Sequence, residues 1–208
     1  MKIRCCRIML FSLALFGFAA DQASKYGMFN YLHEHGTRMV YRDEEAFHTE
    51  VIKGVFKFHA RYLLGAPPAD CALARANGPV PPAVNNGALW NLGGQFKTDA
   101  NKFFAAVSLL AAAGISIWAL RKKSAPDRVL FFALGLILGG TLGNLYDRIV
   151  FGGVRDFLCF YWFEFPVFNV ADSCLVVGAT LLLLQAFFAK KAAPMATAET
   201  SPPQPPAS

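Results

Sequence analysis

Four long apolar segments run along the chain, separated by polar sequence. They cover roughly residues 5–29, 102–120, 129–146 and 170–189. The hydrocarbon core of a bilayer takes about 20 apolar residues per helix, so each segment predicts a membrane-spanning helix. The chain is 55% hydrophobic and only 16% charged, whereas charged residues make up about a quarter of an ordinary soluble domain. We therefore predict an all-α membrane protein with four transmembrane helices in one domain over residues 1–190.

The longest polar stretch, residues 30–100, separates the first two apolar segments. It begins with charged sequence and contains two proline-rich runs, which are typical of loops. Between these parts, residues 51–64 mix aromatic and basic side chains, and their periodicity leaves two interpretations open, an edge strand or an interfacial amphipathic element. We expect a small extracytoplasmic β or loop element here. The Ala-, Pro- and Ser-rich tail, residues 191–208, predicts a disordered cytoplasmic segment.

The basic residues predict how the helices are oriented. If the four predicted helices alternate in direction, many of the basic residues beside them lie on the same side of the membrane. These residues are Lys2, Arg4, Arg7, Arg121, Lys122, Lys123, Arg128, Lys190 and Lys191. Short cytoplasmic segments carry an excess of Lys and Arg, so both termini are predicted to be cytoplasmic. The net charge of +6 is then explained mainly by the basic residues that orient the helices in the membrane. No nucleic-acid partner is expected.

The first apolar segment also resembles a secretory signal, because basic residues precede an apolar run that ends at Ala19-Ala20. We favour an uncleaved anchor, since the apolar run continues beyond Asp21 and its removal would leave three spans. The cysteines form no disulfide framework. A bridge between Cys71 and Cys159, both expected outside, stays open but is not favoured. The four histidines lack regular ligand spacing, so no metal site is predicted.

Two aspartates beside hydrophobic segments are the main candidates for chemistry. Asp156 follows the third segment and Asp172 begins the fourth. An ionised carboxylate is costly beside a membrane core and is usually functional or paired there. Two carboxylates in one poorly solvated site tend to share a proton, so that one can act as acid and the other as base. The alternative is that each aspartate caps a helix at the interface.

The third segment carries a stripe of glycines. Gly135, Gly139 and Gly143 recur at every fourth residue, a spacing that lets a neighbouring helix approach closely. Asn144 and Arg148 share the adjacent face at i and i+4. This polar extension of a glycine stripe predicts the wall of a site at one end of the helix.

In order along the chain, five motifs together resemble lipoprotein signal peptidase, also called signal peptidase II. They are Asp21-x-x-x-Lys25, Asn85-x-Gly87-Ala88, Gly139-Gly140-x-x-Gly143-Asn144-x-x-Asp147-Arg148, Val154-x-Asp156-Phe157 and Phe168-Asn169-x-Ala171-Asp172-Ser173. The resemblance covers residues 1–190 except roughly 30–84. Each motif is weak by itself, and their shared order on four predicted spans gives the resemblance its weight.

The resemblance implies a bacterial inner-membrane aspartyl protease with its active site near the outer face. Such enzymes remove the signal peptide of a prolipoprotein just before a cysteine that carries a diacylglyceryl group. Their partners are lipid-modified prolipoproteins and membrane lipids, they need no metal or organic cofactor, and family precedent suggests a monomer. By motif, Asp156 and Asp172 are the expected catalytic pair, and the supporting residues are expected to be Asn144, Arg148, Asn169, Asn85, Asp21, Lys25 and Asp147.

Arg155 departs from the family pattern, because an aliphatic residue is typical directly before the first catalytic aspartate. Facing the carboxylates, it would lower their pKa; we favour the alternative that it faces lipid headgroups. A second functional hypothesis also stays open, a non-enzymatic transporter or proton relay, since Asp and Arg in membrane helices also mark ion pathways. The polar residues gather at one end of the predicted bundle, which favours the protease.

Overall fold

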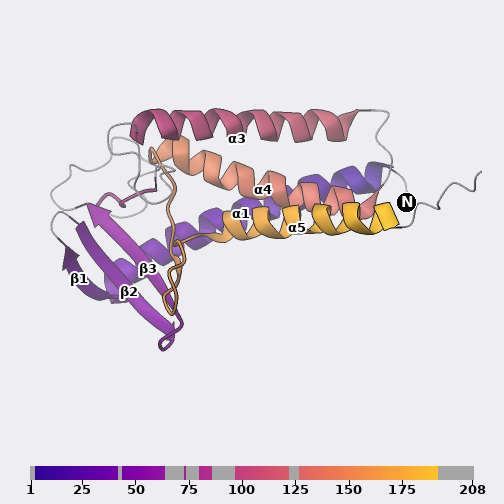
Figure 1. Cartoon of the computed structure of the whole chain (residues 1–208). Helices are drawn as coiled ribbons and strands as arrows, with labels where there is room; N and C mark the ends of the chain where they lie inside the picture. The colour runs from indigo at the N-terminus through magenta and orange to yellow at the C-terminus, as the bar shows by residue number, and fades with distance from the viewer. Residues whose placement is uncertain are drawn as a thin grey trace, which may run out of the picture.

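The computed structural model describes most of the chain, namely residues 3–41, 44–63, 73, 80–85, 97–121 and 127–191. This part contains four helices that are long and apolar enough to cross a membrane. They are α1 (Ile3–His35), α3 (Lys97–Leu120), α4 (Arg128–Val150) and α5 (Val170–Lys191). They form an elongated bundle with a small sheet at one end (Figure 1). The fold class predicted from the apolar segments is thus confirmed for its helices and its β element.

The helices extend beyond the predicted segments in places. α1 has 33 residues, which corresponds to roughly 50 Å at 1.5 Å per residue, whereas a bilayer core is about 30 Å thick. Its last turns reach the sheet. α4 begins after Asp127, whose Oδ1 accepts a hydrogen bond of 3.0 Å from the Leu130 backbone N–H as an N-cap. It ends before Gly152, where a φ of +73° redirects the chain.

The glycine stripe of α4 packs against α1, as its spacing predicts. A Cβ on Gly135 would lie 2.8 Å from the Leu10 carbonyl oxygen, and one on Gly139 would lie 2.8 Å from that of Ala14. Gly140 faces the Ala171 carbonyl of α5 even more closely. Since no larger residue fits at these crossings, glycine allows α4 to contact α1 and α5 at backbone distance.

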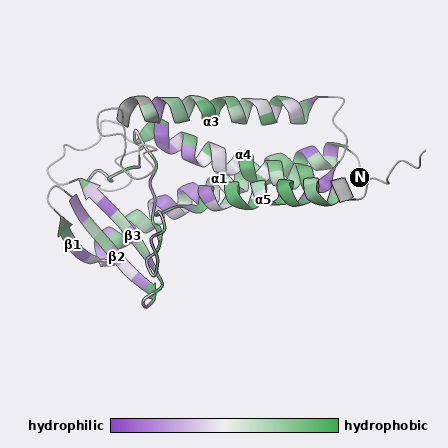
Figure 2. Cartoon of the chain, viewed as in Figure 1, coloured by the Kyte–Doolittle hydropathy of each residue, from purple (hydrophilic) through white to green (hydrophobic). Residues whose placement is uncertain are grey.

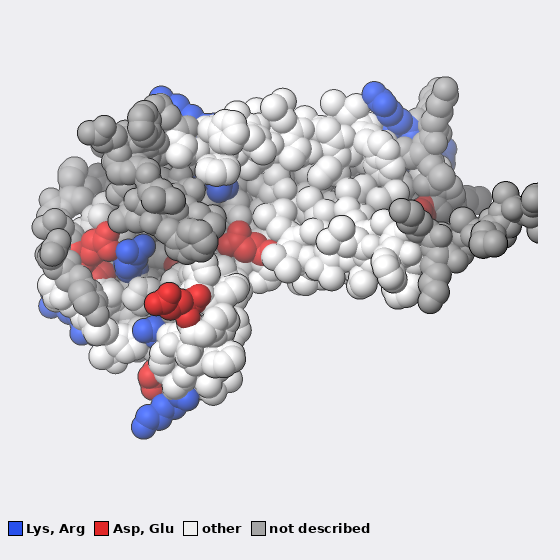
Figure 3. Space-filling view, viewed as in Figure 1, with Lys and Arg blue, Asp and Glu red and all other residues white. Residues whose placement is uncertain are grey.

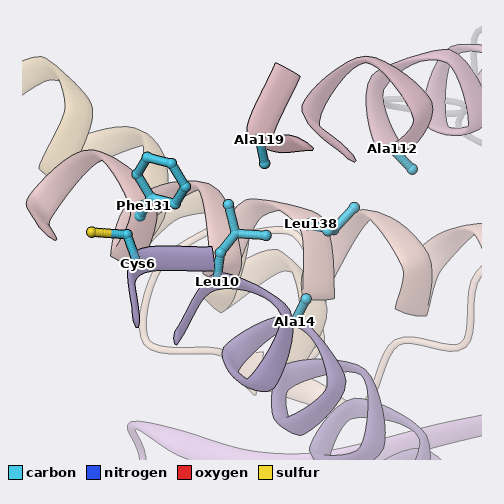
Figure 4. Packing of buried hydrophobic residues seen from close by; sticks show 7 residues of the cluster. All are labelled: Cys6, Leu10, Ala14, Ala112, Ala119, Phe131 and Leu138. Carbon is cyan, nitrogen blue, oxygen red and sulfur yellow. The ribbon is translucent and has the colours of Figure 1, made fainter. Parts of the chain in front are cut away.

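Small and apolar side chains complete the packing at the end of the bundle away from the sheet. Figure 4 shows this cluster, whose members come from α1, α3 and α4: Cys6, Leu10, Ala14, Ala112, Ala119, Phe131 and Leu138. On the outside of the bundle the pattern is reversed, because large apolar side chains such as Phe16 and Leu183 are exposed by 71% and 72%. Exposed apolar surface of this extent indicates contact with lipid.

Polar residues are distributed toward the ends of the molecule. Figure 2 shows helices that are largely hydrophobic, with hydrophilic stretches where α1 and α4 approach the sheet. In the space-filling view, charged side chains gather at both ends, and a band without them covers the helices between (Figure 3). Together with the four apolar helices, this pattern is that of a multi-pass membrane protein.

The sheet has four antiparallel strands in the order β1-β2-β3-β4. The strands are β1 (Thr37–Tyr41), β2 (Glu44–Ile52), β3 (Phe56–Leu63) and β4 (Leu158–Phe160). The stretch left open between an edge strand and an interfacial amphipathic element is described over residues 51–63. It comprises the end of β2, a turn in which Gly54 has a φ of +77°, and β3. One face of the sheet packs against the end of α1 through Phe47, Ala60 and Tyr62. Because β4 comes from the connection between α4 and α5, the sheet also holds that connection in place.

Candidate active site

The connection between α4 and α5 carries Asp156 and is held on both sides. On one side, Val154 and Asn85 exchange two backbone hydrogen bonds of 2.8 Å each. On the other, the Phe157 backbone N–H donates to the Phe168 carbonyl at 3.0 Å. Asp156 therefore sits on a short segment whose backbone is fixed directly before and after it.

Asp172 lies in the first turn of α5 and takes part in a reciprocal cap. The Asn169 backbone N–H donates to Asp172 Oδ2 at 3.2 Å, and the Asp172 backbone N–H donates to Asn169 Oδ1 at 3.0 Å. This is the geometry of a capping box, in which the residue before the helix and the third helical residue satisfy each other's N–H groups. Asn169 is thus the N-cap residue of α5. Asp172 uses Oδ2 in this cap, and its Oδ1 is directed to the site.

Three asparagines surround the two aspartates. Asn169 Nδ2 donates to Asp156 Oδ1 at 2.7 Å, and Asn85 Nδ2 donates to Asp156 Oδ2 at 3.1 Å. Asn144 Nδ2 donates to Asp172 Oδ1 at 2.8 Å, while Asn144 Oδ1 accepts from Asn169 Nδ2 at 3.2 Å. The structure thus brings together two aspartates and three asparagines from segments up to 87 residues apart.

The two carboxylates are held by amides instead of by cations. Among the residues that the structure describes, neither Asp156 nor Asp172 forms an ion pair with Lys or Arg. Burial is the main reason that the pKa of Asp156 rises to about 7, and the charge of Asp172 raises it further; hydrogen bonds from Asn85 and Asn169 and the charge of Lys25 act in the opposite direction. A carboxyl group with such a pKa can hold a proton at neutral pH.

Arg148 stands beside this pair without binding it directly. Its Nη1 donates to the Asn144 carbonyl at 3.2 Å, and its guanidinium lies 5.6 Å from the centre of the Phe104 ring. It interacts electrostatically with both aspartates. Its Nε is buried and has no hydrogen-bond partner among the described residues, so one donor of Arg148 is available beside the carboxylates.

A second group of charges lies behind the first and is fully buried. Lys25 Nζ is 2.8 Å from Asp21 Oδ2 and 3.2 Å from Asp147 Oδ2. The same ammonium donates to Asn144 Oδ1 at 3.2 Å, which links this group to the asparagines around Asp156 and Asp172. Asp21 Oδ1 also accepts from the Ala171 backbone N–H in the first turn of α5 at 2.9 Å. These three residues therefore join α1, α4 and α5 directly behind the site.

The prediction for Arg155 is wrong. Its side chain does not face headgroups: it is fully buried and pairs with Asp147 at 2.8 Å. The sequence gives no periodic signal for this contact, because Asp147 lies in a helix and Arg155 in the connection after it. Gln22, which accepts from Arg155 and donates to Asp21, Asp147 and the Gly143 carbonyl, was missed as well. Its position beside Asp21 in an apolar segment was the available signal.

No metal-binding group of three or more His, Cys, Asp or Glu side chains occurs within the described residues. Cys159 is a free thiol, and its hypothetical partner Cys71 lies outside those residues. His48 and His59 are opposite each other on β2 and β3. Burial is the main cause that lowers the pKa of His59 to about 4, so this side chain stays uncharged at neutral pH. The absence of a cofactor stays a prediction, as do the roles of the individual site residues.

Known proteins resemble this chain in sequence and in fold. The family model described as Signal peptidase (SPase) II matches residues 80–188. A lipoprotein signal peptidase of Rhodopirellula baltica is 36% identical over 194 residues, which cover 86% of this chain and 71% of that protein. One from Symbiobacterium thermophilum is 52% identical over 84 residues, or 39% of this chain and 55% of that protein. One from Pseudomonas syringae pv. tomato is 46% identical over 91 residues, or 42% of this chain and 52% of that protein.

With the last two relatives the matched region thus spans only about half of their length. A solved structure titled as a bacterial membrane enzyme superimposes with a TM-score of 0.59 at 24% identity, over 88% of this chain and 89% of that one. This likeness concerns the fold. The family match includes Asn85, Asn144, Asp156, Asn169 and Asp172. By its match to the family model and its 36% identity along most of the length of a known relative, this chain belongs to the signal peptidase II family.

Proposed function

We propose that this protein is an aspartic endopeptidase of the bacterial inner membrane that removes signal peptides from prolipoproteins. It would cut before the cysteine that carries the diacylglyceryl group. The observation that carries the proposal is the arrangement of Asp156 and Asp172, two neighbouring carboxylates without a cation partner among the described residues, held by asparagine side chains. Membership in the family supports the substrate class.

The pair has the properties needed to activate water. With a pKa raised to about 7, Asp156 holds the shared proton at neutral pH and donates a hydrogen bond to the scissile carbonyl. Asp172 lies in the first turn of α5, where the partial positive charge of a helix N-terminus favours an anion. We therefore assign Asp172 as the general base that takes a proton from the attacking water. Collapse of the tetrahedral intermediate then breaks the C–N bond, and the amine leaves with a proton from the pair.

Supporting residues would bind the substrate backbone. A peptide drawn out of lipid needs hydrogen-bond partners, because the membrane core offers none. The Nε of Arg148, which has no hydrogen-bond partner in the part of the chain that the structure describes, would donate to a substrate carbonyl beside the scissile bond. Asn144 and Asn169 would hold the two carboxylates at a fixed separation, so that little reorganisation accompanies the reaction.

The depth of the site suits a lipid-modified substrate. Asp172 lies in the first turn of one candidate span (Val170–Phe188), and Asp156 follows another that ends at Val150. The carboxylates would thus lie near one membrane interface, where a cysteine anchored by acyl chains presents its peptide bond. The distribution of Lys and Arg predicts that this is the outer face and that both termini are cytoplasmic.

The test is cleavage of a diacylglyceryl-modified prolipoprotein by the purified protein in detergent. The same prolipoprotein without the lipid, and the variants Asp156→Asn and Asp172→Asn, serve as matched controls. We expect cleavage of the lipidated substrate by the wild type alone, with each variant slower by at least about a thousandfold. Cleavage of both substrates would remove the lipid requirement, and an active variant would remove that aspartate from the mechanism. A folded wild type that cleaves neither would favour the proton-relay hypothesis.

A further inference from the structure

Arg155 is a buried cation that the proposed chemistry does not use, and it directly precedes Asp156. It contacts Asp147 of α4 with both its main chain and its side chain. The Arg155 backbone N–H donates to Asp147 Oδ2 at 2.9 Å, its Nε to the same oxygen at 3.3 Å, and its Nη2 to Asp147 Oδ1 at 2.8 Å. Such a two-oxygen contact fixes the orientation of a guanidinium as well as its distance.

The rest of the guanidinium is also held. Nη2 donates to Gln22 Oε1 of α1 at 2.8 Å. Two aromatic rings lie on the planar group, with the Arg155 guanidinium carbon 4.2 Å from the centre of the Tyr26 ring and 3.9 Å from that of Phe151. Stacking of this kind is available to arginine but not to the compact ammonium of lysine. Arg155 is therefore held in one position by contacts with α1, with α4 and with the residue that follows α4.

Arg155 belongs to a buried group of four charged residues. Asp21 and Asp147 contribute two negative charges, and Lys25 and Arg155 contribute two positive charges; all four residues are fully buried. Lys25 pairs with both carboxylates and Arg155 with Asp147. Without Arg155, the two negative charges of this group of four would be matched by the single positive charge of Lys25. Removal of one partner from a buried ion pair is strongly destabilising for this reason.

We propose that Arg155 is a positioning residue, which completes this buried group of four charges and thereby fixes the α4–α5 connection so that Asp156 meets Asp172. The proposal rests on the proposed function. Asp156 is the next residue along the chain, so its direction follows from the backbone that Arg155 anchors to Asp147. Arg155 acts through geometry, because the nearby charges that act most on Asp156 are those of Asp172 and Lys25.

The first arm of the test separates kcat from KM. Arg155→Gln and Arg155→Lys are made in the full chain, and Arg61→Gln, which removes an exposed ion pair with Glu44, is the matched control. Misplacement of a reacting group by about 1 Å can cost about a hundredfold, so we expect Arg155→Gln to lower kcat by that factor with KM within about threefold of the wild-type value. Arg155→Lys should recover only part of kcat, since it keeps the charge and loses the fork and the stacking. A folded Arg155→Gln with wild-type kcat, or a loss confined to KM, would overturn the positioning role.

The second arm measures melting temperature and needs no activity. Arg155→Gln and Asp147→Asn each leave one unbalanced buried charge, and each should lower Tm by on the order of 10 °C. The double variant leaves Asp21 and Lys25 as a neutral pair, so it should melt higher than either single variant. Losses that simply add in the double variant would contradict the charge coupling between Arg155 and Asp147. Should Arg155→Gln fail to fold, the kcat of the double variant provides the activity reading.

The two arms also keep this proposal distinct from the function on which it rests. If the wild type does not cleave the lipidated substrate, the proposed function and the positioning role fall together, while the melting temperatures still decide on the charge set. If the wild type cleaves, Asp156→Asn does not, and Arg155→Gln is fully active, only the positioning role is overturned.

Discussion

Two groups of carboxylates lie next to each other in this protein, and they are stabilised in opposite ways. Asp21 and Asp147 are fully buried and paired with Lys25 and Arg155. Asp156 and Asp172 are half-buried and are held by asparagine amides.

Asn144 connects the groups, since its Oδ1 accepts from Lys25 while its Nδ2 donates to Asp172. The comparison teaches that burial alone does not make a carboxylate reactive. At Asp147 two cations compensate the charge, and the carboxylate stabilises the structure. At Asp156, which has no ion pair among the described residues, burial raises the pKa to about 7, so a proton can be retained near neutral pH.

The largest effect on stability is expected when a compensating cation is removed from the first group, Asp21 and Asp147. In Lys25→Met, Arg155 alone would balance two buried carboxylates, and the free energy of unfolding should fall by about 3–5 kcal/mol. Denaturant unfolding in detergent measures this, and Lys53→Met, at an exposed position of the β2–β3 turn, is the control. A loss below about 1 kcal/mol would mean that the buried charges contribute little to stability.

In the second group, Asp156 and Asp172, removal of a carboxylate charge should instead increase the free energy of unfolding. Because the pKa of Asp156 rises from 3.8 to about 7 on folding, the folded state binds more protons between these values, and its stability falls as pH rises through this window. Asp156→Asn cannot ionise, so at pH 7.5 it should be more stable than the wild type by about 2 kcal/mol, allowing for solvent screening. Thermal unfolding between pH 4.5 and 7.5 measures the difference, which should vanish at the acid end. Equal stability across this range would show that the pKa of Asp156 is unperturbed.

A steric change can disturb the first group without changing any charge. A Cβ on Gly143 would lie 2.5 Å from Asp21 Oδ2, whereas one on Gly114 meets nothing within 4 Å. Gly143→Ala should therefore lower the free energy of unfolding by about 1–2 kcal/mol, while Gly114→Ala should be neutral or slightly stabilising. Similar results for the two variants would contradict the close approach of α4 to Asp21.

The smallest effect is expected at the edge of the second group. Asn85 donates to Asp156 and lowers its pKa, so Asn85→Ala should move the alkaline limb of the cleavage rate upward by a few tenths of a pH unit. The wild-type limb itself should fall near pH 7, where the shared proton is lost. A pH–rate profile measures the shift, and Asn30→Ala, a substitution at an exposed position, is the control. A downward shift would reverse the sign assigned to this hydrogen bond.

Features set by local spacing could be predicted from the sequence. The four apolar segments gave four helices, and the repeat of Gly135, Gly139 and Gly143 gave the close contact of α4 with α1. The motifs around Asn144, Asp156 and Asn169 indicated residues that the structure brings together. Each of these signals extends over a few helical turns at most, which is why it can be read along the chain.

Contacts between distant segments could not be predicted in this way. The sequence left residues 51–64 undecided, because whether they form a strand depends on pairing with β2 and with β4, about 100 residues further on. Arg155 was assigned to the headgroups because a charge beside a membrane segment usually faces water or lipid headgroups. Its actual partners, Asp147 and Gln22, are 8 and 133 residues away.

By itself, then, the sequence determined the number of helices, the close helix contacts along the glycine stripe and the identity of the two candidate aspartates. Hydrophobic length and glycine spacing act within single helices, and their effect does not depend on the rest of the fold. Only the tertiary structure decided which carboxylates are paired with cations and which are held by amides. Compensation of a buried charge depends on which partners folding brings within about 3 Å. Lys25 lies on the same helix as Asp21, but the partners of Asp147 and Asp156 come from separate elements.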